Sequence, residues 1–166
     1  NQLPRFKGRL QWFVKHRRRL VERLLVPPQN GHHLLSIVEE SKMRAILKHM
    51  LDESKFLSDF GLRSLSKEHL KPYELHLGGQ VHTVGYEPAE SSIPLYGGNS
   101  NWRGPVWLPV NYLMIESLRK YHKFYGPSFQ VEMPTGSGVM MNLGEVADAL
   151  SLRLCDIFKH DSEGNL

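Results

Sequence analysis

The sequence predicts a mainly α-helical fold, and two observations support that prediction. Apolar residues recur at helical spacing in four segments, near residues 6–25, 41–51, 109–125 and 142–160. Between the second and third segments, residues 52–105 carry glycines and prolines throughout without a helical period, which indicates a long, loop-rich connection. A chain of 166 residues is long enough for one domain but not for two, so we expect residues 1–166 to belong to a single domain.

The first predicted helix, residues 6–25, is amphipathic and is expected to end at two prolines. Pro27 and Pro28 cannot donate the backbone hydrogen bonds that would continue a helix, and a polar connection follows over residues 29–33. The apolar residues that fall near a 3.6-residue period are Leu10, Phe13, Val14, Leu20, Val21 and Leu24.

The second and third predicted helices have recognisable ends. Ser41 is expected to be the N-cap of the helix over residues 41–51, a position where a hydroxyl accepts a hydrogen bond from a free amide of the first turn. Gly126 and Pro127 end the helix over residues 109–125, because glycine permits the turn and proline cannot continue the helix. The apolar face of the second helix consists of Met43, Ile46, Leu47, Met50 and Leu51.

The fourth predicted helix, residues 142–160, follows a glycine-rich turn over residues 134–138. Asn142 and Glu145 have the spacing of a capping box, in which each side chain accepts a hydrogen bond from the other's backbone. Gly136 and Gly138 before a helix could hold a phosphate, but Gly-x-Gly alone is a weak signal and favours a plain turn. The apolar stripe of this helix consists of Leu143, Val146, Ala147, Leu150, Leu154, Ile157 and Phe158.

Composition excludes several classes of protein. A single cysteine, Cys155, cannot form an intrachain disulfide framework, and the nine histidines lack the spacing of zinc sites, so we expect no metal and no cofactor. No stretch approaches the roughly 20 apolar residues of a membrane span, and the N-terminus lacks the apolar core of a signal peptide. We therefore expect a cytoplasmic protein that does not contact a membrane.

Positive charge is concentrated in the first part of the chain. Residues 1–50 carry 11 Lys or Arg against 3 Asp or Glu, whereas residues 51–166 carry 10 against 14. The dense run Lys15–Arg19 fits either a nucleic-acid surface or a solvated basic helix face. The aromatic interleaving and the recognisable module typical of nucleic-acid binding are missing, so we expect no nucleic-acid partner.

The loop-rich connection contains the segment that is most informative about function. Residues 80–86 alternate in character and are predicted to pair as a small hairpin. Tyr96–Tyr112 combines tryptophans, asparagines and an arginine with glycines and prolines, a mixture that suits sugar binding. Aromatic faces can cover the C–H face of a pyranose, while amide and guanidinium groups reach its hydroxyls. The same tryptophans could instead anchor the core at the start of a helix, and residue types alone do not decide between these interpretations.

A longer pattern of short motifs resembles glycoside hydrolase family sixty-three, the family of processing α-glucosidase I and its microbial relatives. The most specific part is Trp-Arg-Gly-Pro-x-Trp, residues 102–107, preceded by Gly98–Asn101 and followed by Pro109, Asn111 and Tyr112. The other matching segments are Trp12-Phe13, Leu34–Val38, Phe60–Ser66, Tyr86–Ser91 and Pro134–Gly138, so the resemblance covers most of residues 10–160.

The resemblance implies that this chain is part of an (α/α)6 toroid, a double ring of helices around a central pocket. Members of the family are inverting glycosidases, and the resemblance implies α-linked gluco- or manno-type oligosaccharides or glycosides as substrates. Matching the motif residue by residue implies that the sugar pocket is lined by Trp102, Arg103, Gly104 and Trp107, with Asn101 and Asn111 as further candidates.

The catalytic acid and base of the family have no counterpart among these residues. We therefore expect a segment of a glycosidase catalytic domain that is inactive alone and belongs to a longer polypeptide. The alternative is a noncatalytic carbohydrate-binding or scaffold domain. Glu87 and Glu90 are the best-placed local carboxylates, but we expect loop hydrogen bonds or solvent contact rather than catalysis and assign neither a catalytic role.

Overall fold

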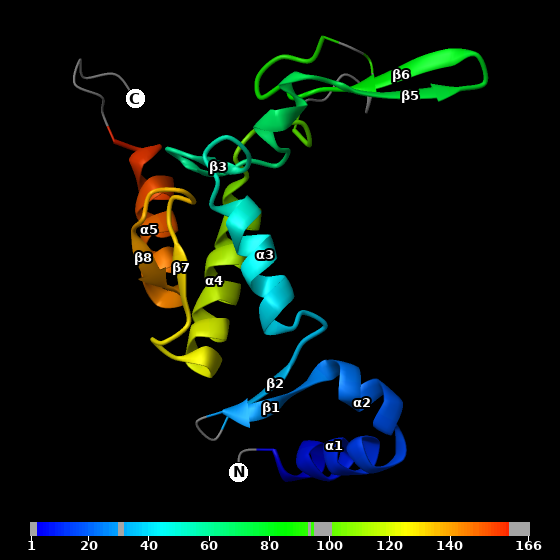
Figure 1. The fold of residues 1–166 in the computed structure, drawn as a ribbon, viewed down its shortest axis with the longest axis vertical. Helices are drawn as coiled ribbons and strands as arrows, with labels where there is room; N and C mark the ends of the chain where they lie inside the picture. The colour runs from blue at the N-terminus through cyan, green and yellow to red at the C-terminus, as the bar shows by residue number, and fades with distance from the viewer. Residues whose placement is uncertain (1–2, 30–31, 93, 95–100, 160–166) are drawn as a thin grey trace. The chain divides into compact units, whose positions relative to one another are not determined.

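The computed structural model describes residues 3–29, 32–92, 94 and 101–159, and helices are its main elements. The chain divides into two compact units, residues 1–43 and residues 44–166 (Figure 1). The helices are α1 (Pro4–His16), α2 (Arg18–Leu24), α3 (Glu40–Met50), α4 (Leu108–Tyr125) and α5 (Leu143–Asp156), with a 3-10 turn, η1 (Lys67–Leu70). The prediction of a mainly α-helical chain is therefore confirmed.

The first unit differs from its prediction in two places. The helix expected over residues 6–25 is interrupted at Arg17, whose backbone (φ −129°, ψ 46°) is not helical, although its N–H still donates to the carbonyl of Phe13. The helical segment ends at Leu24, before Pro27 and Pro28, as predicted, but the prolines lie in strand β1 (Leu25–Gln29). This strand pairs with β2 (His32–Leu35), so the polar connection expected over residues 29–33 is largely part of a strand pair. The register shifts between Val26 and Gln29, because prolines have no N–H to donate to the ladder.

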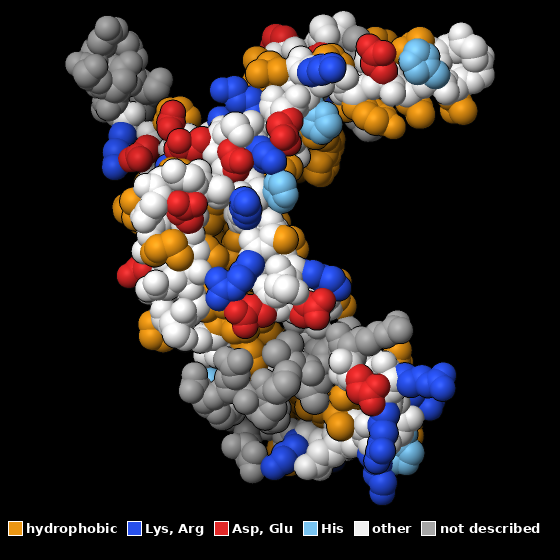
Figure 2. All heavy atoms as spheres, viewed as in Figure 1, with side chains coloured by type: hydrophobic (Ala, Val, Ile, Leu, Met, Phe, Trp, Pro, Cys, Tyr) orange, Lys and Arg blue, Asp and Glu red, His pale blue; other side chains and the backbone are white. Residues whose placement is uncertain are grey.

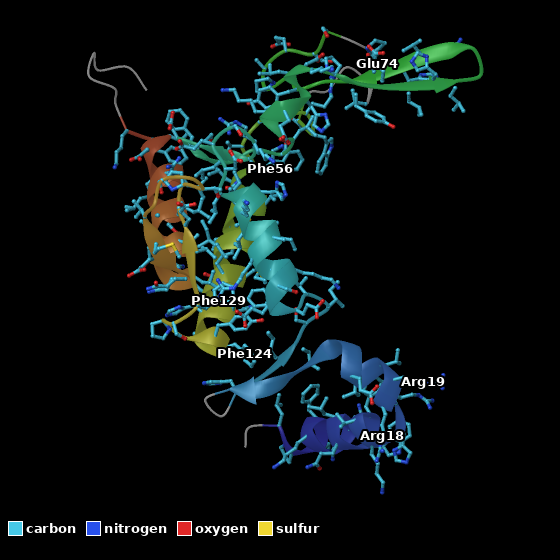
Figure 3. All side chains as sticks on the ribbon, viewed as in Figure 1. Arg18, Arg19, Phe56, Glu74, Phe124 and Phe129 are labelled. Atoms are coloured by element: carbon cyan, nitrogen blue, oxygen red, sulfur yellow. The ribbon has the colours of Figure 1, made fainter. Side chains whose placement is uncertain are left out.

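The basic run of the sequence lies at the surface of this first unit. Lys15 and His16 occupy the last turn of α1, and Arg17 follows it. Arg18 and Arg19 begin α2, and their side chains are exposed (Figure 3). Figure 2 shows several Lys and Arg side chains on the surface of this unit. Within the described part of the chain, no helix is both long and apolar enough to cross a membrane.

The second unit has its core between α4 and α5. The two helices pack against each other (Figure 1). Leu47 in α3 and Leu51, directly after α3, are also buried in this unit. The other fully or almost fully buried apolar residues of these helices are Ile115, Leu118, Phe124, Tyr125, Leu143, Val146, Ala147 and Leu150.

Helix α5 starts where the capping-box spacing predicted. Asn142 Oδ1 accepts hydrogen bonds from the amides of Gly144 (2.9 Å) and Glu145 (3.1 Å), and Glu145 Oε2 accepts from the Asn142 amide (2.7 Å). The helix ends at Asp156, earlier than predicted, and residues 157–159 form a turn. The local spacing was enough to place this start, because every partner lies within three residues.

The loop-rich connection contains short antiparallel strands. Strands β3 (Leu57–Ser58) and β4 (Gly61–Leu62) pair, and β5 (Tyr73–Leu77) pairs with β6 (Gln80–Val84). A small hairpin is thus present as predicted, but it begins earlier than expected, because residues 80–84 form only its second strand. Gly78 and Gly79 have positive φ in its two-residue turn. A further hairpin, β7 (Gln130–Glu132) and β8 (Met140–Asn142), lies before α5 and was not predicted.

Candidate functional site

Two tryptophans form an aromatic wall where the loop-rich connection enters α4. Trp107 is the N-cap residue of α4, and Pro109 lies in the first turn, where its missing N–H removes no helical hydrogen bond. The rings of Trp102 and Trp107 lie 4.2 Å apart between centroids, at an interplanar angle of 39°. Trp107 Nε1 donates to the Asn101 carbonyl (2.7 Å), so its ring is fixed while Trp102 stays 56 % exposed.

This aromatic wall borders a pocket of about 480 Å³ within the second unit. Other lining residues come from α3 and the segment after it, where Phe56 lies (labelled in Figure 3). The lining residues are Ile46, His49, Met50, Phe56, Leu62, Arg63, Ser64, Trp102, Trp107, Val110, Asn111 and Met114. Most of these side chains are apolar, so the pocket suits a ligand with an extended apolar face.

Asn111 joins α4 to strand β4 beneath the pocket. Its side chain is 1 % exposed, and Oδ1 accepts from the Leu62 amide (2.7 Å). Both amide hydrogens are used within the protein, since Nδ2 donates to the carbonyls of Leu62 (3.0 Å) and Trp107 (2.9 Å). Gly61 has a φ of +120°, and a Cβ there would lie 2.9 Å from Asn111 Oδ1, so this close approach requires glycine.

Arg103 is turned into the protein. Its side chain is 1 % exposed, and Nη1 pairs with Glu87 Oε2 at 2.9 Å, while Nη2 donates to the Ser91 hydroxyl. Glu87 also accepts hydrogen bonds from the hydroxyl (2.6 Å) and amide (3.0 Å) of Ser92. These bonds from Ser92, and then the charge of Arg103, hold the pKa of Glu87 below its ordinary value. Arg103 therefore fastens the loop over residues 87–92 to the motif.

Gly104 is buried where the ring of Tyr86 approaches the backbone. Its φ is +139°, and a Cβ at this position would lie 2.6 Å from Tyr86 Cε2. The Gly104 amide donates to Ser64 Oγ (2.9 Å), and Ser64 Oγ donates in turn to the Asn101 carbonyl (3.0 Å). The motif thus supplies the backbone contacts that hold Trp102 and Trp107 in place.

Several predicted features lie away from this pocket. Gly98, Asn99 and Ser100 fall outside the described residues. The glycine-rich turn is a plain turn, because the amides of Gly136 (2.7 Å) and Gly138 (2.6 Å) donate to the carboxylate of Glu132 and lower its pKa. Glu90 is exposed, and no described residue lining the pocket is a carboxylate.

Sequence reasoning missed the lining residues that come from α3 and the segment after it. His49 lies on α3 and accepts a hydrogen bond at Nδ1 from Lys55 Nζ (2.9 Å). Lys55 also pairs with Glu68 (3.3 Å), which lies in η1. The only local signal for His49 is its spacing of three residues from Ile46, which places both side chains on the same face of the helix. The contact with residue 68 depends on tertiary folding.

A helical domain with an apolar, aromatic-lined pocket is typical of proteins that take small organic ligands. A family model, the mannosylglycerate hydrolase MGH1-like glycoside hydrolase domain, matches residues 33–163, and the chain belongs to this family. The resemblance noted in the sequence is therefore confirmed.

The relatives are much longer than this chain. An uncharacterized protein of Saccharomyces cerevisiae is 43 % identical over 168 residues, covering 98 % of this chain and 15 % of the relative. Mannosyl-oligosaccharide glucosidase of the same yeast is 28 % identical over 82 residues (49 % of this chain, 7 % of the relative). A probable mannosyl-oligosaccharide glucosidase of Schizosaccharomyces pombe is 28 % identical over 91 residues (54 % and 8 %). The chain thus spans between 7 and 15 % of the length of these relatives.

Proposed function

We propose that this chain forms one wall of the sugar pocket in an inverting glycoside hydrolase that acts on α-linked gluco- or manno-type oligosaccharides or glycosides. The observation that carries the proposal is the Trp102–Trp107 pair at the edge of an apolar pocket, in a chain of a glycoside hydrolase family. The C–H face of a pyranose would lie against the exposed ring of Trp102.

The other motif residues would act by holding this wall in position. Arg103 and Gly104 are buried and join the wall to the loop over residues 87–92 and to Tyr86. Asn101 supports the Trp107 ring through its carbonyl, and Asn111 ties α4 to β4. Their proposed contribution to sugar binding is therefore indirect, through the position of the two rings.

Inverting hydrolysis requires two carboxyl groups, one on each side of the glycosidic bond. One protonates the leaving oxygen and the other activates a water molecule, and the two stand roughly 6.5–9.5 Å apart to admit that water. Glu87 is unsuited to either role, because Arg103 and Ser92 hold its carboxylate. We propose that both carboxyl groups come from other parts of a longer polypeptide, arranged with this chain as an (α/α)6 toroid.

The test is hydrolysis of α-linked disaccharides and aryl α-glycosides by the complete protein that contains this chain. NMR of the first product should show the β-anomer, as expected for inversion. Replacing Trp102 with Ala should lower kcat/KM by about tenfold or more, which corresponds to about 1.4 kcal/mol of lost transition-state binding. Tyr73→Ala is the matched control, since Tyr73 is a similarly exposed aromatic residue on β5 outside the pocket. Unchanged kinetics for Trp102→Ala would refute the pocket assignment.

A noncatalytic carbohydrate-binding role is the second candidate. It is favoured by one observation, that the pocket lining contains no carboxylate among the described residues. This role predicts that the complete protein binds the same sugars, in a manner sensitive to Trp102→Ala, without releasing product.

A further inference from the structure

The polar side chains around the aromatic wall are mostly committed to the protein itself. Asn111 donates both amide hydrogens to backbone carbonyls, and Ser64 both donates and accepts within the motif. The Trp107 N–H is bonded to Asn101, and Arg63 Nη1 donates to the Leu57 carbonyl. Asn111, Ser64 and Trp107 shape the pocket but have little capacity left for a ligand, whereas Arg63 uses only Nη1 in these bonds.

His49 is different, because one of its two ring nitrogens is bonded and the other is available. A lysine ammonium can only donate, so the Lys55–His49 contact makes Nδ1 the acceptor. With Nδ1 as the acceptor, the ring proton is carried by Nε2. Within the described part of the chain, Nε2 makes no hydrogen bond. His49 thus holds a free N–H donor.

The side chain that carries this donor lines the pocket. His49 is one of the lining residues, whereas Lys55 and Glu68 are not. The nitrogen that Lys55 leaves unbonded, Nε2, thus belongs to a side chain that lines the pocket. Lys55 is itself held by Glu68 at 3.3 Å, and Glu68 accepts from the buried Ser66 hydroxyl at 3.2 Å.

We propose that His49 donates a hydrogen bond from Nε2 to one hydroxyl oxygen of a neutral pyranose stacked on Trp102, and that Lys55 is a positioning residue for the imidazole. This inference rests on the function proposed above and names the side chain that recognises one hydroxyl of the sugar. A donor aimed at one hydroxyl discriminates between sugars that differ at that hydroxyl, because only the matching hydroxyl pairs with it. His49 is then a specificity-determining residue of the site.

The experiment compares kcat/KM of the complete protein for a parent α-glycoside and its series of monodeoxy analogues. His49→Phe should lower kcat/KM for the parent by about 3- to 10-fold, the range of one neutral hydrogen bond. For the analogue that lacks the contacted hydroxyl, wild type and His49→Phe should be equal. His49→Gln, which keeps a donor, should recover part of the loss. The control is His82→Phe, since His82 is exposed on β6 outside the pocket.

A second measurement tests the positioning role of Lys55. In long-range ¹H–¹⁵N spectra, His49 of the wild type should show an unprotonated Nδ1 and a protonated Nε2. Lys55→Met should mix the two tautomers and lower kcat/KM, whereas Lys55→Arg, which still donates, should restore both. An unchanged tautomer in Lys55→Met would refute this role.

The outcomes separate this inference from the proposed function. If Trp102→Ala loses activity while His49→Phe loses the same factor on every analogue as on the parent, the sugar wall stands and the role of His49 is refuted. If the wild type neither hydrolyses nor binds any of the sugars, both are refuted.

Discussion

Trp102 and Arg103 are neighbours in the chain but face opposite environments. The Trp102 side chain is 56 % exposed at the edge of a pocket, whereas Arg103 is 1 % exposed and paired with Glu87. The difference indicates that the Trp-Arg-Gly-Pro-x-Trp motif has two kinds of member: rings that border the pocket and groups that hold the loop behind them. Substitutions should therefore divide into those that change ligand binding and those that change stability.

The largest effect on stability is expected from Arg103→Met. Removing one partner of a buried ion pair leaves hydrogen-bonding groups unpaired and typically costs about 3–5 kcal/mol. Urea denaturation of the chain should show this loss, while Trp102→Ala, at an exposed position, should change the free energy of unfolding by less than about 1 kcal/mol. Equal losses for the two variants would remove the distinction between the two kinds of motif residue.

Gly104→Ala should have the next largest effect. The added Cβ would meet the ring of Tyr86 at 2.6 Å, and the backbone has a positive φ of 139°. Backbone strain and overpacking together should cost about 3 kcal/mol. Gly136→Ala separates the two causes, since Gly136 also has a positive φ but no atom within 4 Å of the added Cβ. If both variants lose the same free energy, the approach of Tyr86 contributes nothing.

The smallest effect is a dependence of stability on pH through Glu87. Bonds from Ser92 and the charge of Arg103 lower its folded-state pKa below the ordinary value of 4.5. The stabilisation that ionised Glu87 contributes is therefore complete above the unfolded-state pKa of this carboxyl group. It is lost as the pH falls through the lower folded-state pKa. Thermal unfolding between about pH 6 and about pH 2 should show a shallower decline for Glu87→Gln than for wild type. Glu90→Gln, at an exposed neighbouring carboxylate, should follow the wild-type curve, and a parallel curve for Glu87→Gln would contradict the prediction.

Features that depend on nearby residues could be read from the sequence. The capping box of Asn142 and Glu145, the apolar stripe that buries Leu150, and the presence of a small hairpin all involve partners within a few positions. The interruption at Arg17 was missed, because the apolar period continues across it. The end of the helix before Pro27 and Pro28 was predicted, but the strand that contains them was not, although the extended backbone that proline favours fits an irregular strand.

By itself, the sequence determined the helical class, the family and the segment that carries the aromatic pair. A sequence motif shows which residue types occur together, but the burial of each motif side chain depends on which other residues pack against it. Only the tertiary structure decided that Arg103 turns inward to Glu87 while Trp102 borders the pocket. It also decided that His49, Lys55 and Glu68 meet, because the contact between η1 and the end of α3 forms only when the chain between them folds back.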